Sequence, residues 1–162
     1  MYGKQTEIAI ASLSRLAEVY DHDDGRLSCA EIAEIRGLQR PFVAKTLSAL
    51  AQAGLVTASR GPGGGFRLGR DPSQITMYEV YRLFEREDTT DDCPFGGGRC
   101  GGDSPCALHA RLVAIQEAMD LFLHETTFDV FRVAYGAKVA KGEATAAIKR
   151  RVRSSYRAPP PA

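Results

Sequence analysis

Apolar side chains in the first third of the chain recur at the spacing of short amphipathic helices. Between Glu7 and Tyr20 they fall every three or four residues, which predicts a helix with one inward side. A second, short helix is predicted from Ser28, where the sequence Ser-Cys-Ala-Glu forms a capping box, to a left-handed cap at Gly37. The residues expected to face the core from these two helices are Ile8, Ile10, Leu13, Leu16, Ala17, Tyr20, Ile32 and Ile35.

A third helix is predicted over residues 40–53, and its Arg-Pro start suits a first helical turn. The spacing of Val43, Leu47 and Leu50 turns these three side chains inward. Two helices joined by a short turn that contains a glycine, the second with an exposed polar and basic side, are typical of a helix-turn-helix. The side chains left on that outer side include Arg40, Lys45 and Ser48.

A β-hairpin is predicted directly after this helix. Short strands over residues 55–59 and 66–68 flank a glycine-rich loop with a basic residue at each base, Arg60 and Arg67. This is the shape of a wing, in which the backbone near Gly63 and Gly64, together with Arg60, can enter a minor groove. A phosphate-binding P-loop would end in Gly-Lys-Ser/Thr, and this loop does not.

The second half of the chain carries a longer apolar repeat. A helix over 76–84 precedes a Cys-rich loop, and a last short helix is predicted over 126–135. Between them, five apolar residues recur at alternating spacings of four and three, which predicts a long helix that packs against another helix. We expect that other helix to be the same helix of a second copy, in a homodimer. The five seam residues are Leu108, Leu112, Ile115, Met119 and Phe122.

Together these elements predict a mainly α fold with a small β wing. The predicted organisation is a winged helix-turn-helix over 1–75, the Cys-rich loop and dimerisation helices over 76–135, and a basic, partly disordered tail over 136–162. A chain of 162 residues is long enough to bury one core. It has no apolar run that could span a bilayer, and its start lacks the pattern of a signal peptide. We therefore expect a cytoplasmic protein.

The formal net charge of +1 hides separate blocks of charge. Residues 1–35 carry seven acids and three bases, whereas residues 36–70 carry six bases and no acid. The acid-free block coincides with the predicted helix-turn-helix and wing. A polyanion such as double-stranded DNA is the partner that this distribution favours.

The Cys-rich loop has the sequence CPFGGGRCGGDSPCALH, from Cys93 to His109. Six residues separate Cys93 from Cys100, five separate Cys100 from Cys106, and His109 follows three residues later. A loop with five glycines and almost no apolar residue loses about 1–2 kcal/mol of backbone entropy for each residue that is ordered. A metal or cluster bound by thiolates would offset this cost. A disulfide is disfavoured in a reducing cytoplasm, so the loop is interpreted as a metallocentre.

Two kinds of metal site fit these donors. Zinc would take three thiolates and one imidazole tetrahedrally and give a structural, zinc-stabilised nucleic-acid-binding module. An iron-sulfur cluster binds to the same thiolates. The cluster is favoured over zinc because a DNA-binding protein whose affinity is regulated needs a labile sensor more than a structural metal. An enzyme is not predicted, because no motif combines a nucleophile, a base and a pocket. The remaining cysteine, Cys29, is expected to be a small buried apolar residue, and His22 and His124 to be surface residues.

The wing sequence RGPGGGF, followed by the three-cysteine loop and CALHARL, resembles the IscR/NsrR-type family of winged-helix transcription regulators over about residues 1–135. The resemblance implies a dimer that binds an iron-sulfur cluster through Cys93, Cys100 and Cys106 and whose cluster state alters operator binding. It also implies that helix 40–53 is the recognition helix and that Arg60 is the wing residue at the minor groove.

The resemblance leaves two residues for the fourth cluster ligand. His109 matches the IscR-type pattern and, on a helix, would share a face with Cys106; it favours a 2Fe-2S cluster over a 4Fe-4S cluster. Glu7 stands where NsrR-type relatives place a carboxylate that reaches the cluster of the partner subunit. The interpretation favours His109 and keeps Glu7 as the alternative. The signal, whether redox state, nitric oxide, or iron and cluster supply, is left open.

Overall fold

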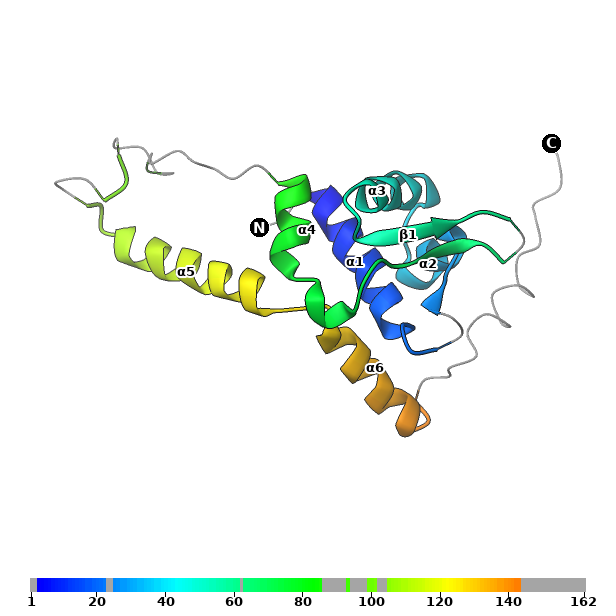
Figure 1. Ribbon diagram of the computed structural model, residues 1–162. Coiled ribbons are helices and arrows are strands. Elements are labelled where there is room, and N and C mark those ends of the chain that lie inside the picture. Colours follow the sequence, from blue (N-terminus) through cyan, green and yellow to red (C-terminus); the bar gives the residue numbers. More distant parts are fainter. Residues whose placement is uncertain are drawn as a thin grey trace.

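The computed structural model describes residues 3–22, 25–61, 63–85, 93, 99–101 and 105–143. In these ranges the chain forms a helical domain with one two-stranded antiparallel sheet, from which a long helix extends to one side (Figure 1). This confirms the predicted fold class, a mainly α protein with a small wing. The elements are α1 (Lys4–Glu18), α2 (Cys29–Arg36), α3 (Arg40–Gln52), β1 (Val56–Ser59), β2 (Gly65–Leu68), the 3-10 turn η2 (Pro72–Gln74), α4 (Met77–Phe84), α5 (His109–Glu125) and α6 (Asp129–Ala140).

Side-chain caps fix where two of the helices begin. The Ser28 hydroxyl accepts a hydrogen bond from the backbone N–H of Glu31 at 3.2 Å, and the Glu31 carboxylate accepts one from the Ser28 N–H at 2.7 Å. Thr76 and Glu79 form the same reciprocal pair at the start of α4. Gly37 ends α2 with a φ of 63°. The capping box and the glycine cap predicted for α2 are thus confirmed, and each N-cap contributes about 1 kcal/mol.

The wing is anchored by a contact that the sequence pattern does not reveal. β1 and β2 pair from Val56 with Leu68 to Ser59 with Gly65. On the other side of β2, Leu27 exchanges two backbone hydrogen bonds with Phe66, at 2.9 and 2.7 Å. The connection between α1 and α2 therefore acts as a short third strand, which holds the base of the wing against the helices.

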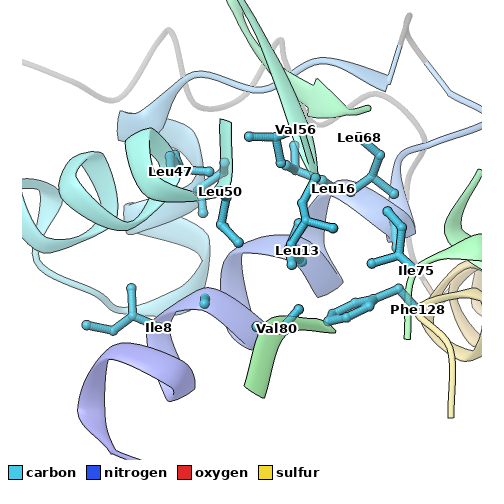
Figure 2. Packing of buried hydrophobic residues seen from close by; sticks show 14 of the residues in the cluster. Ile8, Leu13, Leu16, Leu47, Leu50, Val56, Leu68, Ile75, Val80 and Phe128 are labelled. Atoms are coloured by element: carbon cyan, nitrogen blue, oxygen red, sulfur yellow. The ribbon is translucent and has the colours of Figure 1, made fainter. Parts of the chain in front are cut away.

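One core unites α1, α3, the wing, α4 and the start of α6 (Figure 2). Burying each large apolar side chain contributes about 1.5–3 kcal/mol. The prediction for Ile35 is wrong: it is half-buried and lies outside this core, because α2 is short and turns only Ile32 and Ala33 fully inward. The residues at the centre of the core include Leu13, Leu16, Leu47, Leu50, Ile75, Val80 and Phe128.

Backbone hydrogen bonds join the C-terminal helices to this core. The Met77 N–H donates to the Thr126 carbonyl and the Phe128 N–H donates to the Ile75 carbonyl, both at 2.9 Å. Phe128 is fully buried. The last helix extends to Ala140, beyond the predicted end at Tyr135, and residues 144–162 of the predicted tail lie outside the described residues. None of the described helices combines the length and hydrophobicity that crossing a membrane requires.

Candidate nucleic-acid interface and cysteine site

Helix α3 presents its basic and polar residues to solvent. Val43, Leu47 and Leu50 are fully buried, while Lys45 and Ser48 on the opposite side and Arg40 in the first turn are exposed. The Ser48 hydroxyl donates to the Ala44 carbonyl at 2.9 Å, which leaves its oxygen free to accept a hydrogen bond. No acidic residue occupies the first turn of α3. The partial positive charge of the helix N-terminus is therefore available to a phosphate.

The wing carries the next two basic residues. Arg60 is exposed where β1 ends. Arg67 is exposed on β2, and its Nε donates to the Thr57 hydroxyl on the paired strand at 3.2 Å. Glycine is required at the tip, because Gly63 has a φ of +80° and a Cβ at Gly64 would lie 2.3 Å from the Ser59 carbonyl oxygen. The backbone at the wing tip can thus approach a ligand closely.

Ion pairs separate the six basic residues of the acid-free block into two groups. Arg36 pairs with Glu18 at 2.9 Å, and Arg70 pairs with Glu79. Within the described ranges no carboxylate pairs with the other four, which are Arg40, Lys45, Arg60 and Arg67. These four residues are the ones on α3 and the wing, so the uncompensated positive charge lies on the two elements predicted to contact DNA.

Cys29 lies beside this surface but is not part of the cysteine loop. Its side chain is half-buried against the core, and its Sγ is 3.5 Å from the Arg40 carbonyl oxygen. Burial raises the pKa of the Cys29 thiol, and the nearby Arg40 only partly opposes this shift. A protonated, half-buried thiol acts mainly as a packing group.

The three loop cysteines gather at the N-terminal end of α5. The Sγ of Cys100 lies 3.3 Å from Nδ1 of His109, the first residue of the helix. Burial raises the pKa of the Cys100 thiol, and the nearby thiols of Cys93 and Cys106 raise it further. The Gly101 backbone, at a φ of +76°, lies so close to the imidazole that a Cβ there would be 2.9 Å from Cε1 of His109. The four predicted donors are therefore neighbours.

These donors do not converge into a finished metal site. Among the residues that the structure describes, no three His, Cys, Asp or Glu side chains are arranged so that they could hold a metal ion, and all four thiols are free. The absence of such an arrangement is compatible with the effect of Cys93 and Cys106 on the pKa of Cys100. A neighbouring thiol affects a pKa over several ångströms, whereas ligation requires about 2.3 Å between the sulfur and the metal. The donor set fits a metal, and ligation would draw it closer together.

The position of His109 differs from the prediction. Helix α5 begins at His109, and Cys106 lies in the preceding turn, where its carbonyl accepts the His109 N–H at 3.0 Å. Cys106 is thus one turn outside the helix, and the thiol in contact with the imidazole is that of Cys100.

Glu7 is far from these cysteines within one chain. It lies in the first turn of α1, its side chain is 59% exposed, and its carboxylate pairs with Lys4 at 2.9 Å. Figure 1 shows the described cysteine segments beyond the outer end of α5, away from α1. A single chain thus brings His109, and not Glu7, to the thiols.

The apolar seam of α5 is largely uncovered. Leu108, Ile115 and Phe122 are 46%, 63% and 43% exposed. Leu112 and Met119 are half-buried, and Met119 packs against the core of the domain. In the helix itself only Leu123 is fully buried. The chain on its own leaves most of this seam in contact with water.

Three further side chains bear on the site predictions. Phe42 is 54% exposed on α3, and the sequence patterns above did not single it out as a surface residue. Its position one residue before the inward-facing Val43 is the signal that could have indicated its exposure. His22 is half-buried against the Tyr135 ring, with ring centroids 6.0 Å apart, so it is not a free surface residue. His124 is exposed and stacks on Tyr78.

Comparison with known proteins identifies the family. The chain is 30% identical over 118 residues to an HTH-type transcriptional regulator of Aquifex aeolicus, covering 72% of this chain and 82% of the relative. It is 34% identical over 105 residues to the HTH-type transcriptional regulator IscR of Klebsiella pneumoniae, covering 65% of this chain and 64% of that protein, so the match spans slightly less than two thirds of IscR.

Solved structures share the fold. CymR, the global cysteine regulator of B. subtilis, matches with a TM-score of 0.65 and 25% identity, over 83% of this chain and 97% of CymR. IscR of T. potens matches with a TM-score of 0.64 and 22% identity, over 85% of this chain and 90% of that one. These relatives are transcription regulators and not enzymes, as predicted. Residues 2–131 match the Rrf2 family, described as an iron-dependent transcriptional regulator, and the chain belongs to this family of DNA-binding transcription regulators.

Proposed function

We propose that this regulator binds its DNA operator as a homodimer and that an iron-sulfur cluster, held by Cys93, Cys100, Cys106 and His109, gates its affinity. The observation that carries the proposal is the 3.3 Å approach of Cys100 Sγ to His109 Nδ1, with the thiols of Cys93 and Cys106 close enough to affect the pKa of Cys100. Three thiolates and an imidazole can hold an iron-sulfur cluster, and the resemblance of this ligand set to the IscR-type pattern favours a 2Fe-2S cluster. The similarity to IscR supports the same assignment.

The described cysteines suit this role because their side chains are accessible to a ligand. Cys106 is exposed, Cys93 and Cys100 are half-buried, and Gly101 leaves room for the imidazole. When bound, a cluster supplies a centre whose integrity or oxidation state changes with redox conditions, nitric oxide, or iron and cluster supply. The protein supplies the ligands, and because ligation favours the state that holds the donors together, cluster binding would stabilise that arrangement of the cysteines.

A contiguous set of contacts leads from this segment to the DNA-binding elements. Helix α5 joins the cysteine segment to Thr126, whose carbonyl accepts a hydrogen bond from Met77 at the start of α4. The Phe128 N–H donates a hydrogen bond to Ile75, beside η2. η2 follows β2, the second strand of the wing. A shift of α5 would therefore reach the base of the wing through hydrogen bonds and a buried phenylalanine.

The exposed seam of α5 supports the homodimer. Leu108, Ile115 and Phe122 are apolar, exposed and on one side of the helix, and pairing with a second α5 would remove them from water. A symmetric dimer would place two copies of α3 in successive major grooves about 34 Å apart on a palindromic site. Arg60 on each wing would enter a flanking minor groove, where A·T-rich sequence attracts arginine.

The decisive experiment is anaerobic purification followed by a visible absorption spectrum, iron and sulfide analysis, and DNA-binding titrations of the loaded and cluster-free protein at one salt concentration. The expected result is a coloured protein with iron and sulfide in equal amounts, and a measurable difference in operator affinity between the two forms. A colourless protein that contains zinc would replace the proposal with a zinc-stabilised DNA-binding module. Footprinting that finds no protected duplex in either form would overturn both.

The fourth ligand is tested by comparing His109→Ala with Glu7→Ala, each reconstituted without oxygen. The contact between His109 and Cys100 predicts that only the His109 variant has an altered spectrum. Glu7 is exposed and paired with Lys4 in a single chain, so its variant should match the wild type. An altered spectrum in the Glu7 variant alone would transfer the role to Glu7, reaching across the dimer.

The DNA contacts are tested by Arg60→Ala and Lys45→Ala, with Lys138→Ala on α6 as the matched control. Loss of a phosphate contact lowers the salt dependence of binding by about one counterion, whereas loss of a base contact costs about 1–3 kcal/mol and relaxes specificity. Arg60→Ala should weaken binding mainly at A·T-rich flanks. The control removes an exposed charge of the same sign from a helix outside the proposed interface.

A further inference from the structure

Phe42 is an exposed aromatic residue on the helix that carries Arg40 and Lys45. It is 54% exposed and does not belong to the apolar core or to the residues packed against it. Phe66, by comparison, is half-buried against that core. A large apolar side chain that the fold leaves in water points to a partner that covers it.

The geometry of α3 explains the exposure of Phe42 but gives it no role in the fold. Val43, Thr46, Leu47 and Leu50 occupy the inward side of the helix. Phe42 precedes Val43 by one residue, which turns it about 100° away from that side, towards the edge where Lys45 is exposed. Figure 1 shows α5 extending from the domain on a different side from α3, so the apolar seam of α5 does not continue to Phe42.

The charges that α3 carries near its N-terminus indicate what covers Phe42. Arg40 and Lys45 are exposed and have no carboxylate partner in the described part of the chain, and the first turn of α3 holds no acid. In a helix-turn-helix, the N-terminal residues of the second helix contact base edges in the major groove. The apolar group that a base presents there is the C5-methyl of thymine.

We propose that Phe42 packs against the C5-methyl group of a thymine in each half-site and makes this regulator select thymine at that position. The inference rests on DNA binding through α3 and deepens it: Arg40 and Lys45 hold the phosphate backbone, and the ring of Phe42 reads one base. Because the contact is apolar, it adds sequence preference without adding salt dependence.

The test uses the full-length protein and a duplex selected from a randomised pool by the wild type. Each thymine of the selected site is replaced in turn by deoxyuridine, which pairs identically but lacks the methyl group. Burying one methyl group corresponds to about a fourfold change in affinity, so symmetric replacement in both half-sites is expected to weaken wild-type binding about 15-fold at one position. Phe42→Ala should bind more weakly and lose the distinction between thymine and deoxyuridine. Val133→Ala, an equally exposed apolar residue on α6, should keep it.

The outcomes separate the two levels of the proposal. Wild-type protein that selects a duplex but is indifferent to every methyl group overturns the role of Phe42 and leaves DNA binding intact. A methyl preference that persists in Phe42→Ala assigns the thymine to another residue and also overturns it. Failure of the wild type to select any duplex removes both the reading by Phe42 and the function on which it rests.

Discussion

The winged domain and helix α5 treat apolar residues in opposite ways. In the domain, α1, α3, α4 and the wing share a core in which Leu13, Leu47 and Val80 have no exposed surface. In α5, Ile115 is 63% exposed and Leu123 is the fully buried residue of the helix. Both regions carry helical apolar repeats of similar regularity, yet the chain covers only one of them.

This difference separates two sources of stability. The domain is stabilised by contacts within one chain. Helix α5 is stabilised by the junction at its C-terminal end and, in the proposed dimer, by the second α5 that covers its seam. The cysteine segment lies at the end of α5 that is farther from the domain (Figure 1). The described cysteines, which we propose to hold the sensor, therefore lie away from the core that stabilises the winged domain.

The largest effect is expected at the seam. Ile115→Glu should dissociate the proposed dimer, because each copy would lose an isoleucine that pairing buries, worth about 1.5–3 kcal/mol, which raises the dissociation constant at least ~100-fold. Analytical ultracentrifugation should show a species near 17.6 kDa with an unchanged helical circular dichroism signal. Leu121→Glu is the matched control, since Leu121 is 58% exposed on α5 but off the seam. Dissociation by the control alone would place the interface on the other side of the helix.

A change of similar size, in the free energy of unfolding, is expected in the core. Leu13→Ala should lower the free energy of unfolding by about 2–5 kcal/mol, because Leu13, on α1, is fully buried in the core. Urea denaturation at a fixed protein concentration measures the change, with Leu83→Ala on the surface of α4 as the control. If the two variants were equally stable, the division between a self-sufficient domain and a dependent helix would not hold.

A smaller effect on the fold is expected at the cysteines. Replacing Cys93, Cys100 or Cys106 by Ala should abolish visible absorption and alter operator affinity, yet leave most of the helical signal, because none of the described core residues belongs to the loop. Circular dichroism and thermal unfolding check this, with Cys29→Ala as the variant that keeps the chromophore. Wholesale unfolding of the three loop variants would indicate a structural zinc site.

The smallest effect is expected where α6 meets the winged domain. Arg132 of α6 donates to Asp129 at 2.6 Å and lies near Asp21 and Asp71. Two hydrogen bonds from Ser73 lower the pKa of Asp71, with a lesser contribution from Arg132. This stabilisation is present above the unfolded-state pKa of about 3.9 and is lost as the pH falls through the lower folded-state pKa.

Ser73→Ala should therefore raise the pKa of Asp71 towards its ordinary value and slightly reduce stability at neutral pH. The difference from wild type should disappear at low pH, where the carboxyl is protonated in both proteins. An NMR titration of the Asp71 carboxyl measures the shift directly, and Ser154→Ala in the tail serves as the control. A lower Asp71 pKa in the Ser73 variant would contradict the assignment of Ser73 as the donor.

Local signals predicted the winged domain well. The capping box at Ser28, the glycine cap at Gly37 and the wing glycines each depend on neighbouring residues, so their physical cause is present in a short stretch of sequence. The seam of α5 was readable for the same reason, since helical periodicity is local. It predicted an uncovered apolar side without any knowledge of the rest of the fold.

Contacts between distant segments were not predictable in this way. Glu85 accepts hydrogen bonds from the Gly3 N–H, at 2.7 Å, and from the Thr6 hydroxyl, residues 82 and 79 positions earlier in the chain that no local pattern links to it. Ile35 fits the core pattern of α2 but finds no partner there. Likewise, the pairing of His109 with Cys100 depends on how a glycine-rich loop folds back, which periodicity does not encode.

The attachment of α5 at one end gives the helix the mechanics of a lever. Its 17 residues span about 25 Å, and its fulcrum is the junction where Thr126 and Phe128 are bonded to Met77 and Ile75. A displacement of ~2 Å at the cysteine end corresponds to a rotation of only ~5° at that fulcrum, given this length. If two copies are clamped together along α5, the same small rotation tilts each domain relative to the other. Hydrogen bonds to bases tolerate displacements of only a few tenths of an ångström. A rotation of a few degrees at this junction is therefore enough to misalign the two winged domains on one DNA duplex.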